Sequence, residues 1–252
     1  MLALLGALRE EITGLKRHMV LEEVFVQEGC HVFRGRYKNK AILLVQTGIG
    51  KERAEAATKF ILERYSVTAL VSLGFAGALT EELKVGDIIL CSTLYRDNRC
   101  TQGEAGLGNP YYSDASLVSV ASLTLALQRT AIRFCQGNSV TVAQPVSKAE
   151  AKCALGKAFH ADGVDMESYW VARIASAKQV PFIAIRAISD TMQDNLIPFD
   201  QILDSNGKWR LKRVALFFLF HPQHVIRLFA LLKNARQAMR SLTTFVDYLV
   251  VK

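Results

Sequence analysis

Strand and helix patterns alternate along most of the chain. Strand-like segments, mostly continuous apolar runs, are found at residues 2–7, 31–37, 41–48, 68–79, 85–95, 139–146, 162–166 and 181–190. Helical spacing follows most of them and predicts helices that begin near residues 9, 51, 116, 148, 167 and 223. Continuous apolar strands are typical of a sheet with both faces covered, so this order predicts an α/β domain.

Length and composition agree with one large domain. The chain has 252 residues, of which 50% are hydrophobic and 21% are charged. We expect residues 1–195 to form the core and residues 196–252 to form a basic, amphipathic helical extension of the same domain. The opening MLALLGALREEI is only briefly apolar and lacks a basic leader, which favours a core strand over a signal peptide.

Cysteine usage and charge narrow the class of protein. The five cysteines are widely spaced and form no CxxC pair, which favours free thiols in a cytoplasmic protein without a zinc site or other cofactor. The net charge is +8, and the whole excess lies in residues 205–246, which hold eight Lys/Arg and no Asp/Glu. Large aliphatic residues interleave with these cations and no nucleic-acid motif is found, so nucleic-acid binding is not expected.

Candidate chemistry lies where the predicted strands end. Ligands of open α/β sheets gather beyond the carboxyl ends of the strands. In this chain those ends are Ala7 before LREE, Thr47 before GIG, Leu73 before GFAG, Met166 before Glu167 and Ile188 before SD. The sequence therefore predicts a site built from several distant segments.

One family is indicated by five motifs in a fixed order: GALREEI, QTGIGKERA, LGFAGAL followed by LKVGDII, VDMES, and PFIAIRAISD. Together they resemble the nucleoside phosphorylase/nucleosidase superfamily, especially its bacterial methylthioadenosine/S-adenosylhomocysteine nucleosidase branch. The resemblance covers roughly residues 1–195. It implies a three-layer α/β/α sandwich around a central mixed, barrel-like sheet, and cleavage of a purine–ribose N-glycosidic bond.

The resemblance implies a role for individual residues. Glu11 corresponds to the residue that activates water, Arg186 to one that helps to position the water, and Asp190 to the acid at purine N7. Glu167 corresponds to the carboxylate that binds the ribose hydroxyls. Such a set suits the reaction, because bond cleavage leaves positive charge on the ribose and negative charge on the base. The other implied substrate contacts are Met166, Gly48, Gly74, Phe75, Pro145 and Val146.

Each of these residues also has a plain structural interpretation. Glu11 and Glu167 could be acids that stabilise the start of a helix, and Asp190 could be an N-cap. Arg186 could pair with an acid such as Asp165, which we interpret as a supporting residue. Met166 could be ordinary core, and the Gly48 segment a tight turn.

Departures from the family pattern concern the substrate. Phe75 stands where methylthioadenosine nucleosidases usually have a small hydroxyl residue, and Ser72 stands where related phosphorylases have an arginine for phosphate. Water is therefore favoured over phosphate as the nucleophile. Pro145 and Val146 replace the usual base-stacking Phe region, and Phe75 is a candidate for lining the pocket of the sugar or its 5′-substituent.

The C-terminal segment differs from that branch. A helix from Gln223 would line up an apolar face with Lys233, Arg236 and Arg240 near one edge. This pattern is typical of a helix at a membrane surface, and also of a helix packed on the domain or on a dimer partner, which is the commoner case. The apolar face would consist of Val225, Leu228, Phe229, Leu232, Ala235, Met239 and Leu242.

GFAGAL, VDMES, IRAISD and this tail together resemble the hopanoid-associated branch, which is linked to removal of adenine from adenosylhopane. We therefore expect an adenine-releasing nucleosidase for a lipid-linked nucleoside. We expect a cytoplasmic homodimer, peripheral on the inner face of the membrane through residues 208–242. The alternatives are a methylthioadenosine/S-adenosylhomocysteine or futalosine-type nucleosidase, a phosphate-dependent phosphorylase, and a non-catalytic nucleoside-binding module at a membrane.

Overall fold

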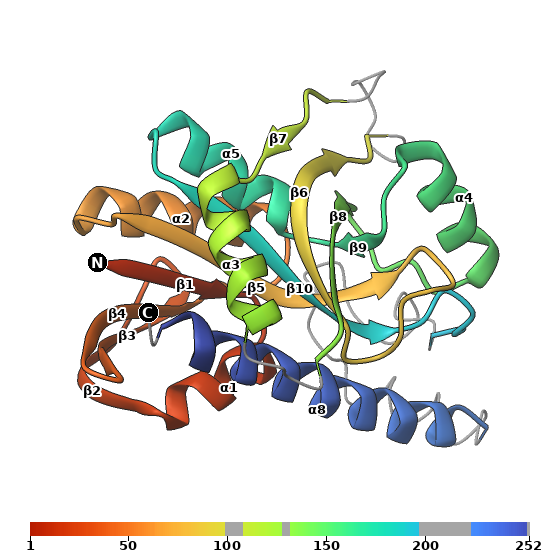
Figure 1. Ribbon diagram of the computed structural model, residues 1–252, viewed down its shortest axis with the longest axis horizontal. Helices are drawn as coiled ribbons and strands as arrows, with labels where there is room; N and C mark the ends of the chain where they lie inside the picture. Colours follow the sequence, from red (N-terminus) through yellow and green to blue (C-terminus); the bar gives the residue numbers. More distant parts are fainter. Residues whose placement is uncertain (99–107, 128–131, 197–222, 251–252) are drawn as a thin grey trace.

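The computed structural model describes residues 1–98, 108–127, 132–196 and 223–250 (Figure 1). Cys100 and most of the segment 196–222 lie outside these residues. The four described cysteines are free thiols. Within the described part of the chain, no helix has the length and hydropathy needed to cross a bilayer.

Ten strands form one sheet. They are β1 (Leu2–Gly6), β2 (Met19–Gln27), β3 (Cys30–Tyr37), β4 (Lys40–Gln46), β5 (Ala69–Ala78), β6 (Ile88–Arg96), β7 (Tyr111–Tyr112), β8 (Phe134–Thr141), β9 (Gly163–Asp165) and β10 (Phe182–Asp190). The described helices are α1 (Arg9–Arg17), α2 (Lys51–Arg64), α3 (Ala115–Leu127), α4 (Ala149–Phe159), α5 (Ser168–Ala177) and α8 (Gln223–Leu249).

Five of the strands close into a ring. β5 pairs in parallel with β10, and β10 pairs antiparallel with β6. β6 pairs in parallel with β8, β8 with β9, and β9 returns antiparallel to β5. From β5 the sheet continues outward through β1, β4, β3 and β2. The predicted mixed, barrel-like sheet is confirmed.

Helices cover the two faces of this sheet, because neighbouring strand residues point to opposite sides. Ala3 and Leu5 of β1 pack in one core cluster with α2 and α5, whereas Leu4 packs in another with α1, α3 and α8. Figure 1 shows α2 and α5 on one side of β1 and β5, and α1 and α8 on the other. A third cluster lies under α4. The predicted α/β/α layering is thereby confirmed.

Three details differ from the sequence-based expectation. β2 was not predicted, because four of its apolar residues (Val20, Leu21, Val24 and Val26) face solvent at the sheet edge and a bulge between Leu21 and Glu23 breaks the alternation. β5 does not turn at GFAG but continues to Ala78, since it is bridged there by β9 and β10. β8 ends at Thr141, before the predicted end at Pro145.

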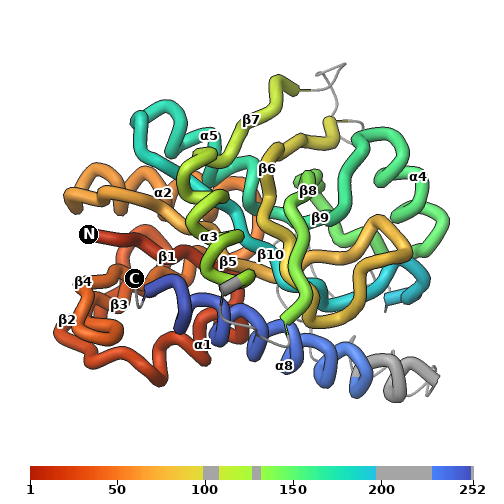
Figure 2. Tube along the Cα trace, viewed as in Figure 1, coloured from red at the N-terminus to blue at the C-terminus, as the bar shows by residue number. Residues whose placement is uncertain are grey.

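The C-terminal helix α8 begins at the predicted Gln223, but its apolar residues do not form one exposed face. Ala238, Leu242 and Phe245 are fully buried in the core cluster with α1 and α3. Phe229 and Leu232, by contrast, are 67% and 44% exposed. The helix therefore packs on the domain through its C-terminal half, and Figure 2 shows it running along the domain toward the N-terminal strand.

Candidate functional site

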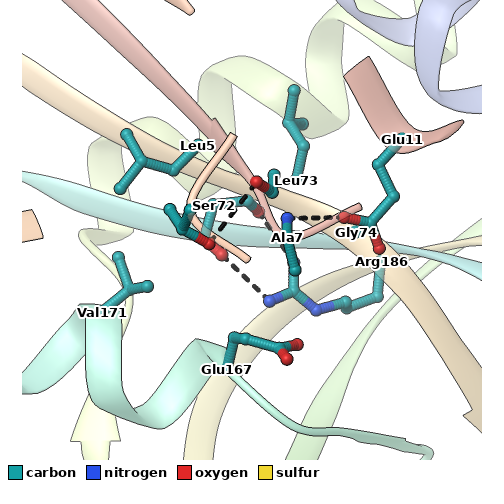
Figure 3. Close-up of a pocket in the computed structure, with 11 residues that line it drawn as sticks. Leu5, Ala7, Glu11, Ser72, Leu73, Gly74, Glu167, Val171 and Arg186 are labelled. Carbon is teal, nitrogen blue, oxygen red and sulfur yellow. Dashed lines mark hydrogen bonds between the residues drawn. The ribbon is translucent and has the colours of Figure 1, made fainter. Parts of the chain in front are cut away.

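A single pocket brings together four of the predicted site residues: Glu11, Gly74, Glu167 and Arg186. They come from α1, β5, the start of α5 and β10, and the pairing of β5 with β10 places Gly74 directly beside Arg186. In Figure 3 the carboxylates of Glu11 and Glu167 lie on either side of the Arg186 guanidinium. The remaining lining residues are Leu5, Gly6, Ala7, Thr47, Ser72, Leu73 and Val171.

Glu11 is held by the backbone. Its Oε2 accepts hydrogen bonds from the backbone N–H groups of Ala7 (2.7 Å) and Leu8 (2.9 Å), and its Oε1 accepts one from Phe75 (2.9 Å). Through the Leu8 N–H it does cap the start of α1, as the structural interpretation had it, but it is only 4% exposed and so is not a surface acid. Burial raises the pKa of Glu11 above its ordinary value, and the three N–H groups and Arg186 oppose that rise.

Arg186 is a buried cation, and four of its five N–H groups have an acceptor among the described residues. Its Nε donates to Asp165 Oδ2 at 2.5 Å, and its remaining nitrogens donate to Ser72 Oγ at 2.9 Å and to the carbonyls of Ser72 and Ile185 at 3.0 Å. Asp165 is itself fixed by Thr141 Oγ1 at 2.6 Å and by the Ser168 hydroxyl. The structure therefore contains the Arg186–Asp165 pair of the structural interpretation, and Arg186 also lines the pocket.

Gly74 allows these two charged groups to approach one another. A Cβ atom at this position would lie 3.1 Å from Glu11 Oε1 and 3.3 Å from Arg186 Cζ. Both distances are shorter than most carbon contacts, so a side chain would require Glu11 and Arg186 to shift by a few tenths of an ångström. The glycine of GFAG is needed for space rather than for a turn.

Glu167 stands at the N-cap position of α5, and its Oε1 accepts a hydrogen bond from the Gly50 backbone N–H at 2.8 Å. Gly50 has φ of 92°, a left-handed conformation that suits glycine. Burial, and then repulsion by Asp165 and Glu11, raises the pKa of Glu167 to about 8. The site therefore contains a carboxyl group that changes its charge near neutral pH.

This shift has a consequence for stability. The native state binds a proton on Glu167 more readily than the unfolded chain, so the stabilisation is complete below a pH of about 4.5 and is lost as the pH rises through about 8. We expect the free energy of unfolding in urea to fall over this range, and to fall less in Glu167→Gln. Glu63→Gln, at an exposed position, should retain the slope of the parent. Equal slopes in parent and Glu167→Gln would contradict the assignment.

Asp190 lies outside the group that lines this pocket, at the end of β10. It is buried, and its Oδ2 is 2.5 Å from Nζ of Lys152, while Ser189 Oγ donates to its Oδ1 at 2.8 Å. In the described residues no helix follows it directly, so it is not an N-cap. Lys152 was not singled out from the sequence, because one lysine in a helix rich in Ala and Lys carries no distinguishing signal.

The other predicted contact residues are more scattered. Gly48 has φ of 85°, and its N–H donates to the Ala7 carbonyl at 3.1 Å. Phe75 is half-buried against the cluster of α1, α3 and α8, whereas Val146 and Met166 pack against the cluster under α4. Pro145 is exposed. None of these five is among the residues that line the pocket, although the Phe75 N–H holds Glu11.

Comparisons with known proteins agree with the fold. The family described as Phosphorylase superfamily matches residues 1–214. The 5′-methylthioadenosine/S-adenosylhomocysteine nucleosidases of Bacillus thuringiensis (strain Al Hakam) and Bacillus anthracis are each 28% identical over 212 residues, which covers 81% of this chain and 91% of theirs.

Two solved structures are similar at low sequence identity. Futalosine hydrolase of Helicobacter pylori strain 26695 has a TM-score of 0.79 at 22% identity, covering 99% of this chain and 97% of its own. The 5′-methylthioadenosine/S-adenosylhomocysteine nucleosidase of Neisseria meningitidis, solved in complex with methylthio-immucillin-A, has a TM-score of 0.78 at 21% identity with the same coverage. These likenesses support the fold.

Proposed function

The chain belongs to the phosphorylase superfamily, and from that premise we propose that it hydrolyses the N-glycosidic bond between adenine and a ribose derivative. The observation that carries the proposal is the convergence of Glu11, Arg186 and Glu167 on one pocket. Nucleosidases are among its relatives, at 28% identity over 81% of the chain. Each charged group of the pocket matches one requirement of the reaction.

Glu11 is the proposed base that activates water. Its pKa is raised by burial, which makes its carboxylate a better proton acceptor than an exposed glutamate. Backbone N–H groups fix both of its oxygens, so the base is held in one orientation. Arg186, at the same pocket, would help to position the attacking water.

Glu167 is the proposed partner of the ribose hydroxyls. In its ionised form, which the pKa of about 8 makes the minor one at neutral pH, the carboxyl group accepts hydrogen bonds from two neighbouring hydroxyl groups. The negative charge of that form favours an oxocarbenium-like sugar in the transition state. Met166 precedes it and is proposed to lie beneath the sugar. Asp190 is proposed to donate a proton to N7 of the leaving base, so that adenine departs uncharged.

Water is favoured over phosphate as the nucleophile by the surroundings of Arg186. Ser72, Asp165 and the Ile185 carbonyl accept four of the five N–H groups of this guanidinium, which leaves one donor for a water but not the several that a phosphate would need. Glu11 adds a carboxylate at the same pocket, and Glu167 adds a second negative charge when the pH rises through its pKa of about 8. A dianionic phosphate would be repelled there, whereas a neutral water would not.

For the 5′-substituent we propose a bulky apolar group, as in adenosylhopane. The half-buried Phe75 replaces a small hydroxyl residue beside the site, and Phe229 and Leu232 are exposed on α8 with the exposed cations Lys233, Arg236 and Arg240 nearby. Such a surface suits an amphiphilic substrate presented by an anionic membrane. Peripheral membrane contact through residues 208–242 remains part of this proposal.

One assay separates these possibilities. We expect the enzyme to release adenine at the same rate with and without phosphate, and to prefer adenosylhopane over adenosine and methylthioadenosine. Free adenine is measured with and without anionic lipid vesicles. The vesicles are then sedimented, and the enzyme in the pellet is measured. Strict dependence on phosphate would contradict hydrolysis. Turnover confined to methylthioadenosine would contradict the lipid-linked substrate. An enzyme that does not sediment with the vesicles would contradict the membrane contact.

Two further nucleosidase activities remain as alternatives, because relatives with these activities are similar to this chain: methylthioadenosine/S-adenosylhomocysteine and futalosine hydrolysis. A non-catalytic nucleoside-binding module is the alternative from another class. Calorimetry that detects an intact bound nucleoside, with no adenine formed, would favour that module. The homodimer stays a prediction, which light scattering measures directly.

A further inference from the structure

Lys152 on α4 is a fully buried lysine, with no exposed surface. Lysine is almost never buried to this extent unless its charge is paired. Its Nζ is 2.5 Å from Asp190 Oδ2, and it donates to the carbonyls of Thr191 at 2.8 Å and Asp194 at 3.1 Å. These three acceptors use all three ammonium hydrogens, so the position of Nζ is fixed.

Asp190 in turn has little freedom. Ser189 Oγ donates to its Oδ1 at 2.8 Å, opposite the side that Lys152 occupies. A Cβ atom at Gly77 would lie only 2.8 Å from Oδ2, which shows how closely β5 approaches this carboxyl group. The carboxyl group is therefore held from three sides by α4, β5 and its own strand.

We propose that Lys152 is the positioning residue of Asp190, and this inference rests on the proposed function. For the reaction Asp190 first takes up a proton from solvent. Its O–H bond then breaks as the N7–H bond of the base forms, and the electron pair of the C1′–N9 bond passes to the base. The oxygen of the attacking water bonds to C1′ while its proton passes to Glu11. Asp190 is left as a carboxylate. The ammonium of Lys152 is placed to stabilise that charge at the moment it appears.

An ion pair kept only for folding is the competing explanation. A buried ion pair adds little to stability compared with a well-packed apolar pair, whereas removal of one partner is costly. Activity must therefore be measured in variants that remove the pair as a unit as well as one partner at a time. Lys157 on the same helix is exposed and provides a matched control.

The test is a double-mutant cycle of Lys152→Met and Asp190→Asn, with Lys157→Met as the control, measured as adenine release from a substrate that the parent cleaves. We expect Asp190→Asn to lower kcat by about a thousandfold and Lys152→Met by about a hundredfold, with KM changed less than about threefold. The double variant should equal Asp190→Asn, because Lys152 acts only through Asp190. Lys152→Arg should regain part of the loss.

Either of two results overturns the proposal. One is a double variant whose kcat falls by the product of the two single reductions. The other is a folded Lys152→Met variant whose kcat is near that of the parent. If Lys152→Met unfolds, the comparison of the double variant with Asp190→Asn still decides, because no unpaired buried charge remains in the double variant. A parent that releases no adenine from any adenosine derivative refutes the proposed function first, and the inference falls with it.

Discussion

Replacing Glu11 by glutamine is expected to lower kcat for adenine release by about a thousandfold, with little change in KM. Glutamine has the same shape but cannot accept the proton of the attacking water. Its amide nitrogen would also oppose one of the backbone N–H groups that now donate to the carboxylate, which costs about 1–3 kcal/mol of stability. Steady-state kinetics at a temperature well below the melting point of the variant measure the effect.

Glu10→Gln is the control for this experiment, since Glu10 precedes Glu11 on the same helix turn but is exposed. The control should match the parent in kcat and in stability. A Glu11→Gln enzyme that is folded and releases adenine at the rate of the parent would refute the role of Glu11. A loss that appears in KM alone would instead make Glu11 a binding residue.

Replacing Asp165 by asparagine is expected to destabilise the protein by about 3–5 kcal/mol, because it leaves the guanidinium of Arg186 buried without its ion-pair partner. Arg186 is only 2% exposed, so water cannot take the place of the carboxylate. Thr141 and Ser168 would also lose a charged acceptor. Urea unfolding, analysed with a common slope for parent and variant, measures the change.

The matched control for the buried pair is an exposed one. Arg36 and Glu22 are 3.3 Å apart on β3 and β2, with side chains that are 62% and 46% exposed. Glu22→Gln should change the free energy of unfolding by less than about 1 kcal/mol, because water screens this pair. An Asp165→Asn effect as small as that of Glu22→Gln would show that Asp165 does not hold Arg186 in place.

The order of the elements follows from the sequence where burial leaves a clear pattern. β1, β4 and β10 are apolar on both faces, and α2 and α5 keep a buried stripe, so all five could be predicted. β2 has no such pattern, because it is an edge strand and most of its apolar side chains face solvent. Ring closure between β5 and β10 is a long-range pairing that no local pattern encodes.

In the site, too, residues in local motifs could be predicted, whereas long-range contacts could not. Glu11, Glu167 and Arg186 stand at strand ends or in motifs, and the structure brings them to one pocket. Phe75, Pro145 and Val146 were expected as substrate contacts on the family pattern, yet they do not line that pocket. Lys152 meets Asp190 across a separation of 38 residues. Such a contact depends on how α4 packs beside the end of β10, and a single sequence cannot reveal it.

The backbone bonds that hold Glu11 have a consequence for how this site can diverge. Every residue except proline has a backbone N–H. The hydrogen bonds to the Glu11 carboxylate therefore do not depend on which side chains occupy positions 7, 8 and 75. Phe75 can therefore stand in place of a small hydroxyl residue without disturbing Glu11. Substrate preference can therefore change through these side chains during evolution while the Glu11 carboxylate stays where it is.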